Sequence, residues 1–457
     1  MCWPAGTQFI ILLMNRIMMT SEILIMNKES VALAADSAGT LTSEKIYTSF
    51  NKIYVLSKTA PVGCMIYNHV EFMGVPWETV IKLYRNNLGD KKFSTLVEYD
   101  QDFKSFLVNY FSEEYQVVFF KIAIIKILNL IRSRIEELKK NIFQYKGAIS
   151  PEELMEILTK VIEKAYNFLS VQGLNSSLSP EDGEKFRALF KETIDENIAN
   201  IYGEFNISDD LKGKLFEITI SSFTKCIKNQ PNFFESGVII TGFGEEEIFP
   251  SYSFSTMNGV FNGKLMVILN NSHSINLEIG AVIRPFAQHE MVDTFMEGID
   301  PNYKAVMDSY HKDLLFKFPK SLLDIIERKL VEKGLITNIP HDIKREFISE
   351  LETVSEVEFK KNQKKFSDYR LHNHINIVIN VVQALPKDEL AAMAESLISL
   401  TSFKRRVSMQ APTVGGPIDV AVISKKDGFI WIKRKHYFDP DLNSDYFNTS
   451  PDNNERR

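Results

Sequence analysis

The sequence predicts an α+β protein, because strand-like apolar runs near both ends enclose segments with helical periodicity. Residues 21–36 read as two short apolar strands joined by a polar turn, and residues 415–431 read as a strand, an Asp-Gly turn and a strand. Helical patterns occupy 131–140 and 151–169 between them. With 457 residues, 44% hydrophobic and 25% charged, the chain has room for one large or two modest cores.

Two of the expected helices begin at a proline followed by acidic residues. Pro151 precedes Glu152 and Glu153, and Pro386 opens an Ala-rich segment that runs to about Ser402. Proline suits the first helical turn because its missing N–H would have no partner there, and acidic residues are favoured by the helix dipole. Residues 173–180, rich in Gly, Ser and Asn, are expected to form a loop.

Thr20, Asp36 and Lys52 follow one another at two equal sixteen-residue steps, and each borders a strand-like segment. A threonine hydroxyl needs a base, and a free α-amine, with a pKa of about 7.7 to 8.0, provides one on the same residue if the mature chain begins there. A nearby lysine would keep that amine neutral, and an aspartate would keep the lysine charged and oriented. These residue types therefore suit N-terminal threonine catalysis.

The segments VALAADSAGT and NKIYVLS resemble the opening of proteasome β subunits and their bacterial relatives, the N-terminal-nucleophile threonine peptidases. In that family a threonine becomes the first residue, an Asp follows the first hairpin and a Lys opens the third strand. Counted from Thr20, Asp36 and Lys52 match both offsets without a gap. The resemblance resumes at 237–259 and 385–431 and covers about half of the chain.

The resemblance implies a four-layer αββα sandwich of two antiparallel sheets flanked by helices, with large helical insertions. The expected organisation is 1–19 as a propeptide or mis-assigned start, 20–111, 233–302 and 385–440 as three parts of the core, 112–232 and 303–384 as helical insertions, and 441–457 as a flexible tail. Met19 before a small residue is a good substrate for methionine removal, so translation from Met19 is the preferred interpretation of the start.

The chain also departs from the family pattern. Many members carry a serine in a Gly-Ser-Gly turn and an Asp-x-x-Ser before a late Gly-Gly, whereas the corresponding stretches here are 285–288 (PFAQ) and 411–414 (APTV). The glycine whose backbone N–H lies in the family's oxyanion hole falls near Ile66 or Tyr67. A backbone donor needs no particular side chain, so these two amides are the expected oxyanion donors.

The resemblance implies hydrolysis of a peptide bond through an ester on Thr20, with Lys52 tuning the amine and Asp36 orienting Lys52. A homo-oligomeric ring is the expected assembly. Two alternatives remain: an amidase or acylase acting on a small molecule, and a catalytically silent scaffold whose helical insertions bind a partner. The start of the mature chain separates the enzymes from the scaffold, because Thr20 needs a free amine.

Other functions find little support in the sequence. A net charge of −6 gives no reason to expect nucleic acid or an anionic membrane as a partner, and three scattered cysteines suit a reducing cytoplasm. The apolar run 117–131 is shorter than the roughly 20 residues of a membrane span. His372 and His374 could be metal ligands on a strand face, but no Cys or Asp stands near them in ligand spacing, so neither metal nor cofactor is expected.

Overall fold

The structure is a computed structural model that describes residues 20–40, 46–47, 49–227, 234–407, 415–436, 438–439 and 441–443. It divides into two compact units. Unit 1 comes from Met1–Ala287 and Pro386–Arg457, and unit 2 is Gln288–Leu385. The expected propeptide or mis-assigned start, most of the expected tail and the 411–414 stretch lie outside the described residues.

Unit 1 contains a five-stranded antiparallel sheet with the strand order β12-β1-β2-β13-β14. The two hairpins expected from the sequence are confirmed and lie next to each other in this sheet. The strands are β1 (Ser21–Asn27), β2 (Ser30–Asp36), β12 (Ala281–Ala287), β13 (Ile418–Ser424) and β14 (Gly428–Lys433). Every residue of β1 and β2 is buried, so this hairpin lies in the centre of unit 1.

A second five-stranded antiparallel sheet has the order β11-β10-β9-β6-β5. Its strands are β5 (Ile53–Val55), β6 (Val62–Asn68), β9 (Ser236–Gly242), β10 (Ser251–Phe261) and β11 (Lys264–Ser274). Two small sheets pair β3 (Gly39–Thr40) with β4 (Ile46–Tyr47) and β7 (Glu71–Phe72) with β8 (Val75–Pro76). The predicted α+β class with antiparallel sheets is therefore confirmed.

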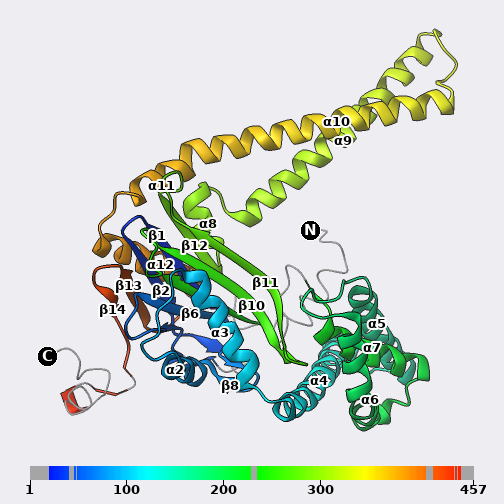
Figure 1. The fold of residues 1–457 in the computed structure, drawn as a ribbon. Helices are drawn as coiled ribbons and strands as arrows, with labels where there is room; N and C mark the ends of the chain where they lie inside the picture. Colours follow the sequence, from blue (N-terminus) through cyan, green and yellow to red (C-terminus); the bar gives the residue numbers. More distant parts are fainter. Residues whose placement is uncertain are drawn as a thin grey trace. The chain divides into compact units, whose positions relative to one another are not determined.

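The two large sheets share one apolar core, because alternate residues along each strand point into it. Leu24 and Met26 of the first sheet and Met65 and Ile239 of the second belong to this cluster. The other face of β6 and β9 contributes to a different cluster with α2 (Trp77–Leu88) and α3 (Leu96–Tyr110). Helix α12 (Lys387–Val407) packs against β1, β2 and β13 (Figure 1).

Helices α4 to α7 form a further part of unit 1 around a core of aromatic rings. They are α4 (Glu113–Lys146), α5 (Pro151–Ser170), α6 (Pro180–Tyr202) and α7 (Asp209–Thr224), with the short turn η1 (Gly203–Phe205) before α7. Phe186 of α6 lies 5.0 Å, between ring centroids, from Phe261 of β10. This contact joins the helices to the end of the β10–β11 hairpin.

The apolar run 117–131 lies within α4 and is amphipathic rather than uniformly buried. Phe120 and Ile124 are buried, whereas Val118 and Ile122 are more than half exposed. In the part of the chain that the structure describes, no helix combines the length and apolar character needed to cross a membrane.

Unit 2 is helical and begins at Gln288, earlier than the Tyr303 expected from the sequence. Its elements are α8 (Glu290–Glu297), α9 (Pro301–Glu332), α10 (His341–Arg370), the π-helical turn η2 (Leu371–Ile375) and α11 (Asn376–Val382). The earlier boundary arises because α8 contacts α9 and η2. His372 and His374 lie in η2, so the strand considered for them is wrong.

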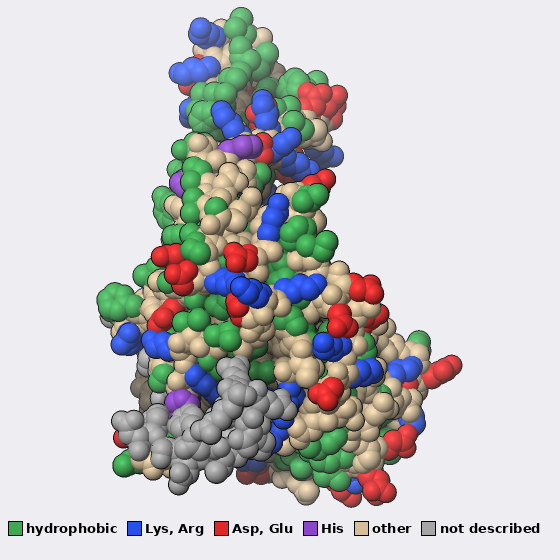
Figure 2. All heavy atoms as spheres, turned by 60° about the vertical axis from the view of Figure 1, so that its left-hand side comes forward, with side chains coloured by type: hydrophobic (Ala, Val, Ile, Leu, Met, Phe, Trp, Pro, Cys, Tyr) green, Lys and Arg blue, Asp and Glu red, His purple; other side chains and the backbone are tan. Residues whose placement is uncertain are grey.

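The α9–α10 hairpin exposes much apolar surface. Figure 2 shows apolar side chains along this hairpin, at the top of the view. Tyr310 and Phe318 of α9 are 66% and 62% exposed, and Val354 and Val357 of α10 are each 59% exposed, so neither helix hides its apolar residues within the hairpin alone. A short turn, η3 (Asp441–Asn443), lies near the end of unit 1.

Candidate active site

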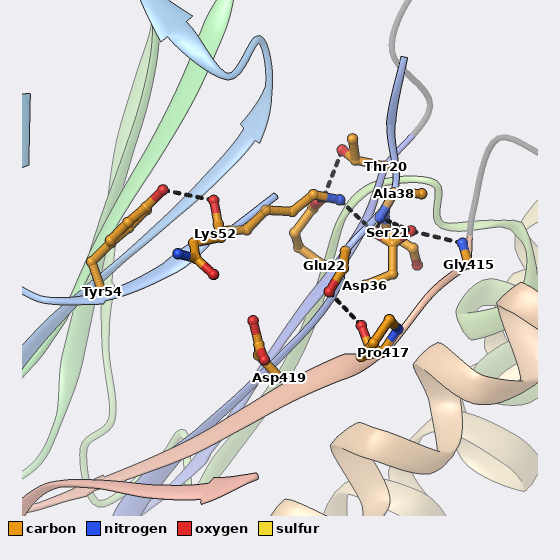
Figure 3. A network of polar contacts seen from close by, with 12 residues as sticks. Thr20, Ser21, Glu22, Asp36, Ala38, Lys52, Tyr54, Gly415, Pro417 and Asp419 are labelled. Atoms are coloured by element: carbon orange, nitrogen blue, oxygen red, sulfur yellow. Dashed lines mark hydrogen bonds and ion pairs between the residues drawn. The ribbon is translucent and has the colours of Figure 1, made fainter. Parts of the chain in front are cut away.

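The structure brings together the three residues that the sequence singled out. Thr20 directly precedes β1, Asp36 ends β2, and Lys52 directly precedes β5 of the opposite sheet. Their exposed fractions are only 1%, 1% and 3%. Because β1 pairs with β2, the ends of these strands carry Thr20 and Asp36 to the same edge, where Lys52 reaches them from the facing sheet (Figure 3).

Lys52 and Asp36 form a buried ion pair, with Lys52 Nζ 2.5 Å from Asp36 Oδ1. Asp36 also accepts hydrogen bonds from the backbone N–H groups of Ser21 (3.0 Å), Ala38 (3.3 Å) and Gly415 (2.9 Å). A buried carboxylate is stable when charged and polar donors surround it. These four donors hold the Asp36 carboxylate in place.

Glu22 is a fourth member of the site, which the sequence interpretation missed. The Thr20 hydroxyl donates a hydrogen bond to Glu22 Oε2 at 3.0 Å, and Glu22 Oε1 lies 3.1 Å from Lys52 Nζ. Residues two apart on a strand point to the same side, so Thr20 and Glu22 are neighbours by backbone geometry. The signal was present in the sequence: one glutamate begins a run of apolar strand residues, where an unpaired charge would be costly.

The environment shifts the pKa values of Glu22 and Lys52. Burial raises the pKa of Glu22 from 4.5 to about 7; the attraction of Lys52 opposes this rise, and the negative charge of Asp36 adds to it. Burial disfavours the charged form of Lys52, but Asp36 and Glu22 outweigh that effect and raise its pKa above 10.5. Lys52 is therefore an ammonium at neutral pH, whereas Glu22 changes its charge close to neutrality.

A small pocket of about 10 Å³, close to the size of one water molecule, adjoins Thr20. Lys52, Tyr67, Asn68 and His69 are among the residues that line it. Asn68 has a φ of 66°, in the left-handed region, where the chain turns out of β6. The pocket therefore lies at the junction of β1, Lys52 and the turn after β6.

The two amides expected to stabilise an oxyanion lie in β6. The Ile66 N–H donates to the Lys52 carbonyl at 2.8 Å, so this amide is already engaged and the assignment of Ile66 as a free oxyanion donor needs correction. Tyr67 lines the pocket and pairs with Gly237 of β9. Its role as a donor stays a prediction.

The stretch 285–288, which replaces the family's Gly-Ser-Gly turn, lies at the end of β12 and just beyond it. Phe286 is the β12 neighbour of Glu22, and Ala287 is that of Ser21. The structure thus places a phenyl ring, rather than a serine hydroxyl, beside Glu22.

A second buried ion pair lies close to the site. Lys435 Nζ contacts Asp419 of β13, and the Lys435 N–H donates to Asp419 Oδ1 at 2.8 Å. Asp419 is 3% exposed, and Lys435 lies close enough to Lys52 and Asp36 to interact electrostatically with both. Across those same residues, no group of three or more His, Cys, Asp or Glu side chains is placed to hold a metal ion.

The comparisons with known proteins do not assign the chain to a family. No family model matches it, and no curated protein matches it. Among solved structures it is similar to Anbu (ancestral beta-subunit) from Yersinia bercovieri, with a TM-score of 0.26, 9% sequence identity, and coverage of 92% of this chain and 89% of that chain. A match at this level assigns no function to the chain.

Proposed function

We propose that this chain is a threonine peptidase of the N-terminal-nucleophile type, which hydrolyses peptide bonds through Thr20. The observation that carries the proposal is the buried Lys52–Asp36 ion pair beside Thr20. A buried charge pair is costly to desolvate and is weak evidence for stability, which favours a role in chemistry. Perturbed pKa values in the same cluster support that role.

The proposed fold is the four-layer αββα sandwich that the sequence resemblance implies. Two facing sheets that share a core, α12 against one and α2 and α3 against the other, support it. In this arrangement Thr20 lies at the edge of the sandwich core, next to the pocket that Lys52 and Asn68 line. The homo-oligomeric ring stays a prediction.

The reaction proceeds in two steps. Thr20 Oγ attacks the carbonyl carbon, the proton of the hydroxyl passes to a base, and collapse of the tetrahedral intermediate releases the amine and leaves an ester on Thr20. Water then hydrolyses the ester. Asp36 orients Lys52, the positive charge of Lys52 stabilises negative charge near the nucleophile, and the backbone N–H group at the turn of Asn68 is the proposed oxyanion donor.

The proposal is tested by measuring hydrolysis with purified chains whose first residue has been established by intact mass. A panel of fluorogenic peptides and a panel of small acyl amides are offered to the wild type, Thr20→Ser and Thr20→Ala. We expect peptide turnover by the wild type, slower turnover by Thr20→Ser and none by Thr20→Ala. Turnover of acyl amides alone would point to an amidase, and equal activity of wild type and Thr20→Ala would rule out Thr20 as nucleophile.

A further inference from the structure

Glu22 is the residue of the site that the family pattern does not explain. It is fully buried, and its neighbours across the first sheet are Ala35 and Phe286, neither of which offers a polar partner. Its carboxylate is held by the Thr20 hydroxyl on one oxygen and by Lys52 near the other. Burying a carboxylate costs free energy of folding. The hydrogen bond between this buried carboxylate and the nucleophile therefore calls for a chemical explanation.

Two carboxylates share one ammonium in this cluster. Lys52 lies within 3.1 Å of both Asp36 and Glu22, so the fully ionised set carries one excess negative charge. In addition to Lys52, Asp36 accepts three backbone N–H groups, whereas among the described residues Glu22 has only the Thr20 hydroxyl in addition to Lys52. When a proton enters the cluster, Glu22 is therefore the carboxylate that takes it.

The groups that face Glu22 come from several elements. Lys52 precedes β5, Asp36 ends β2, and Tyr67 of β6 lies close enough for its hydroxyl to interact electrostatically with Glu22. Burial raises the pKa of Tyr67, so Tyr67 stays neutral over the working range. The pKa of Glu22, raised by burial to about 7, makes this carboxyl group change its charge near neutral pH.

We propose that Glu22 is the general base for Thr20: its carboxylate accepts the hydroxyl proton as Thr20 Oγ attacks. This proposal rests on the proposed function. The proton moves from Thr20 Oγ to Glu22 Oε2, the new C–O bond forms, and the protonated Glu22 returns the proton to the leaving amine as the C–N bond breaks. In the second step Glu22 takes a proton from water and gives it back to Thr20 Oγ as the ester is cleaved.

If Glu22 is the base, activation of the Thr20 hydroxyl does not require the α-amine of Thr20. An amine base is available only when Thr20 is the first residue, whereas the hydrogen bond from Thr20 to Glu22 is formed by two side chains. Thr20 should then be acylated even when residues before it remain attached. The rate should rise with pH as Glu22 loses its proton.

The test follows acylation of Thr20 by a hydroxyl-reactive β-lactone, measured by intact mass from about pH 5.5 to about pH 9. In the wild type we expect a rate that rises through about pH 7, the pKa of Glu22. Glu22→Gln keeps the shape of the side chain but cannot accept the proton. It should acylate about 100-fold more slowly or worse, without the rise near neutrality.

Asp100→Asn in α3 is the matched control, because it neutralises another buried carboxylate that is paired with a lysine, Lys104, but leaves Glu22 and Thr20 in contact. It should keep the wild-type pH profile. Glu22→Asp should retain a pH-dependent rate, since the carboxylate is kept. A Glu22→Gln chain that acylates as fast as the wild type, with the same pH profile, would overturn the proposal.

A second measurement does not depend on a folded variant. Wild-type chains that retain Met19 should be acylated on Thr20, and their acylation rate should show the same rise near pH 7. If chains that begin at Thr20 are acylated but chains that retain Met19 are not, the α-amine is the base. If the wild type is not acylated on Thr20 in either form, the proposed function itself fails. Failure of the Glu22 role alone leaves Thr20 acylated.

Discussion

Lys52 Nζ lies 2.5 Å from Asp36 Oδ1, in a site where the two residues are 3% and 1% exposed. The same ammonium is 3.1 Å from Glu22 Oε1, and Glu22 accepts the Thr20 hydroxyl. One cation thus holds two carboxylates in place beside a nucleophile. Stability and reactivity should therefore depend on the same few charges.

Replacing Lys52 by methionine should destabilise the fold strongly. The substitution keeps a long apolar side chain but leaves two buried carboxylates without their cation, for which about 3–5 kcal/mol is the usual cost. Urea denaturation at neutral pH measures the loss. Lys433→Met is the control, because its ion pair with Glu395 is partly exposed to solvent and should contribute about 1 kcal/mol or less. Equal unfolding free energies of the two variants would show that Lys52 does not stabilise the buried carboxylates of Asp36 and Glu22.

The stability of the wild type should fall between about pH 4.5 and pH 7 relative to Glu22→Gln. The folded state raises the pKa of Glu22 from 4.5 to about 7, so in this window the folded chain binds a proton that the unfolded chain releases. Unfolding therefore becomes easier as pH rises, by about 3 kcal/mol once Glu22 is ionised in both states.

Denaturant titrations of the wild type and Glu22→Gln at about pH 5 and about pH 8 give this difference directly. The variant removes the titrating group, so other carboxylates cancel in the comparison. A difference in unfolding free energy that is the same at both pH values would show that Glu22 has an ordinary pKa in the folded chain.

Asp36→Asn should lower the rate of peptide hydrolysis by a larger free energy than it lowers the free energy of unfolding. The amide keeps the size of the side chain but weakens its hold on Lys52, and a small displacement of a catalytic group costs about 100-fold in rate. We expect a comparable fall in kcat with little change in KM, measured by steady-state kinetics on the best peptide substrate. Unchanged kcat would remove Asp36 from the positioning role.

Replacing either of two glycines by alanine should change the stability of the chain, in opposite directions at the two positions. A Cβ on Gly237 of β9 would lie 2.0 Å from the ring of Tyr67, so Gly237→Ala must displace a residue of the pocket and should cost about 1–3 kcal/mol. Gly213 in α7 has nothing within 4 Å of that position, so Gly213→Ala should stabilise the chain by about 0.5–1 kcal/mol. Thermal unfolding of both variants provides the comparison; a stabilised Gly237→Ala would contradict the packing described for Tyr67.

Local patterns in the sequence were sufficient to predict two of the hairpins and the starts of two helices. The β1–β2 hairpin, the β13–β14 hairpin and the helix starts at Pro151 and close to Pro386 follow from periodicity and capping, and the structure confirms them. The boundary of unit 2 could not be predicted, because it depends on contacts of α8 with distant helices.

In the candidate site, too, residues could be predicted where local spacing identifies them, but not where their role depends on contacts between distant segments. The spacing of Thr20, Asp36 and Lys52 led to residues that the fold does bring together. Glu22 was missed because its meaning depends on Lys52 arriving from the opposite sheet. Ile66 was assigned from an offset along the chain, whereas its amide direction is set by pairing with the strand that follows Lys52.

The central claim is that Thr20 is the nucleophile, and trapping the ester on Thr20 tests it most directly. The chain is incubated with the β-lactone, digested, and mapped by tandem mass spectrometry. We predict one acyl group, located on Thr20 Oγ, in the wild type and none in Thr20→Ala. An acyl group on another residue, or equal labelling of wild type and Thr20→Ala, would contradict the claim.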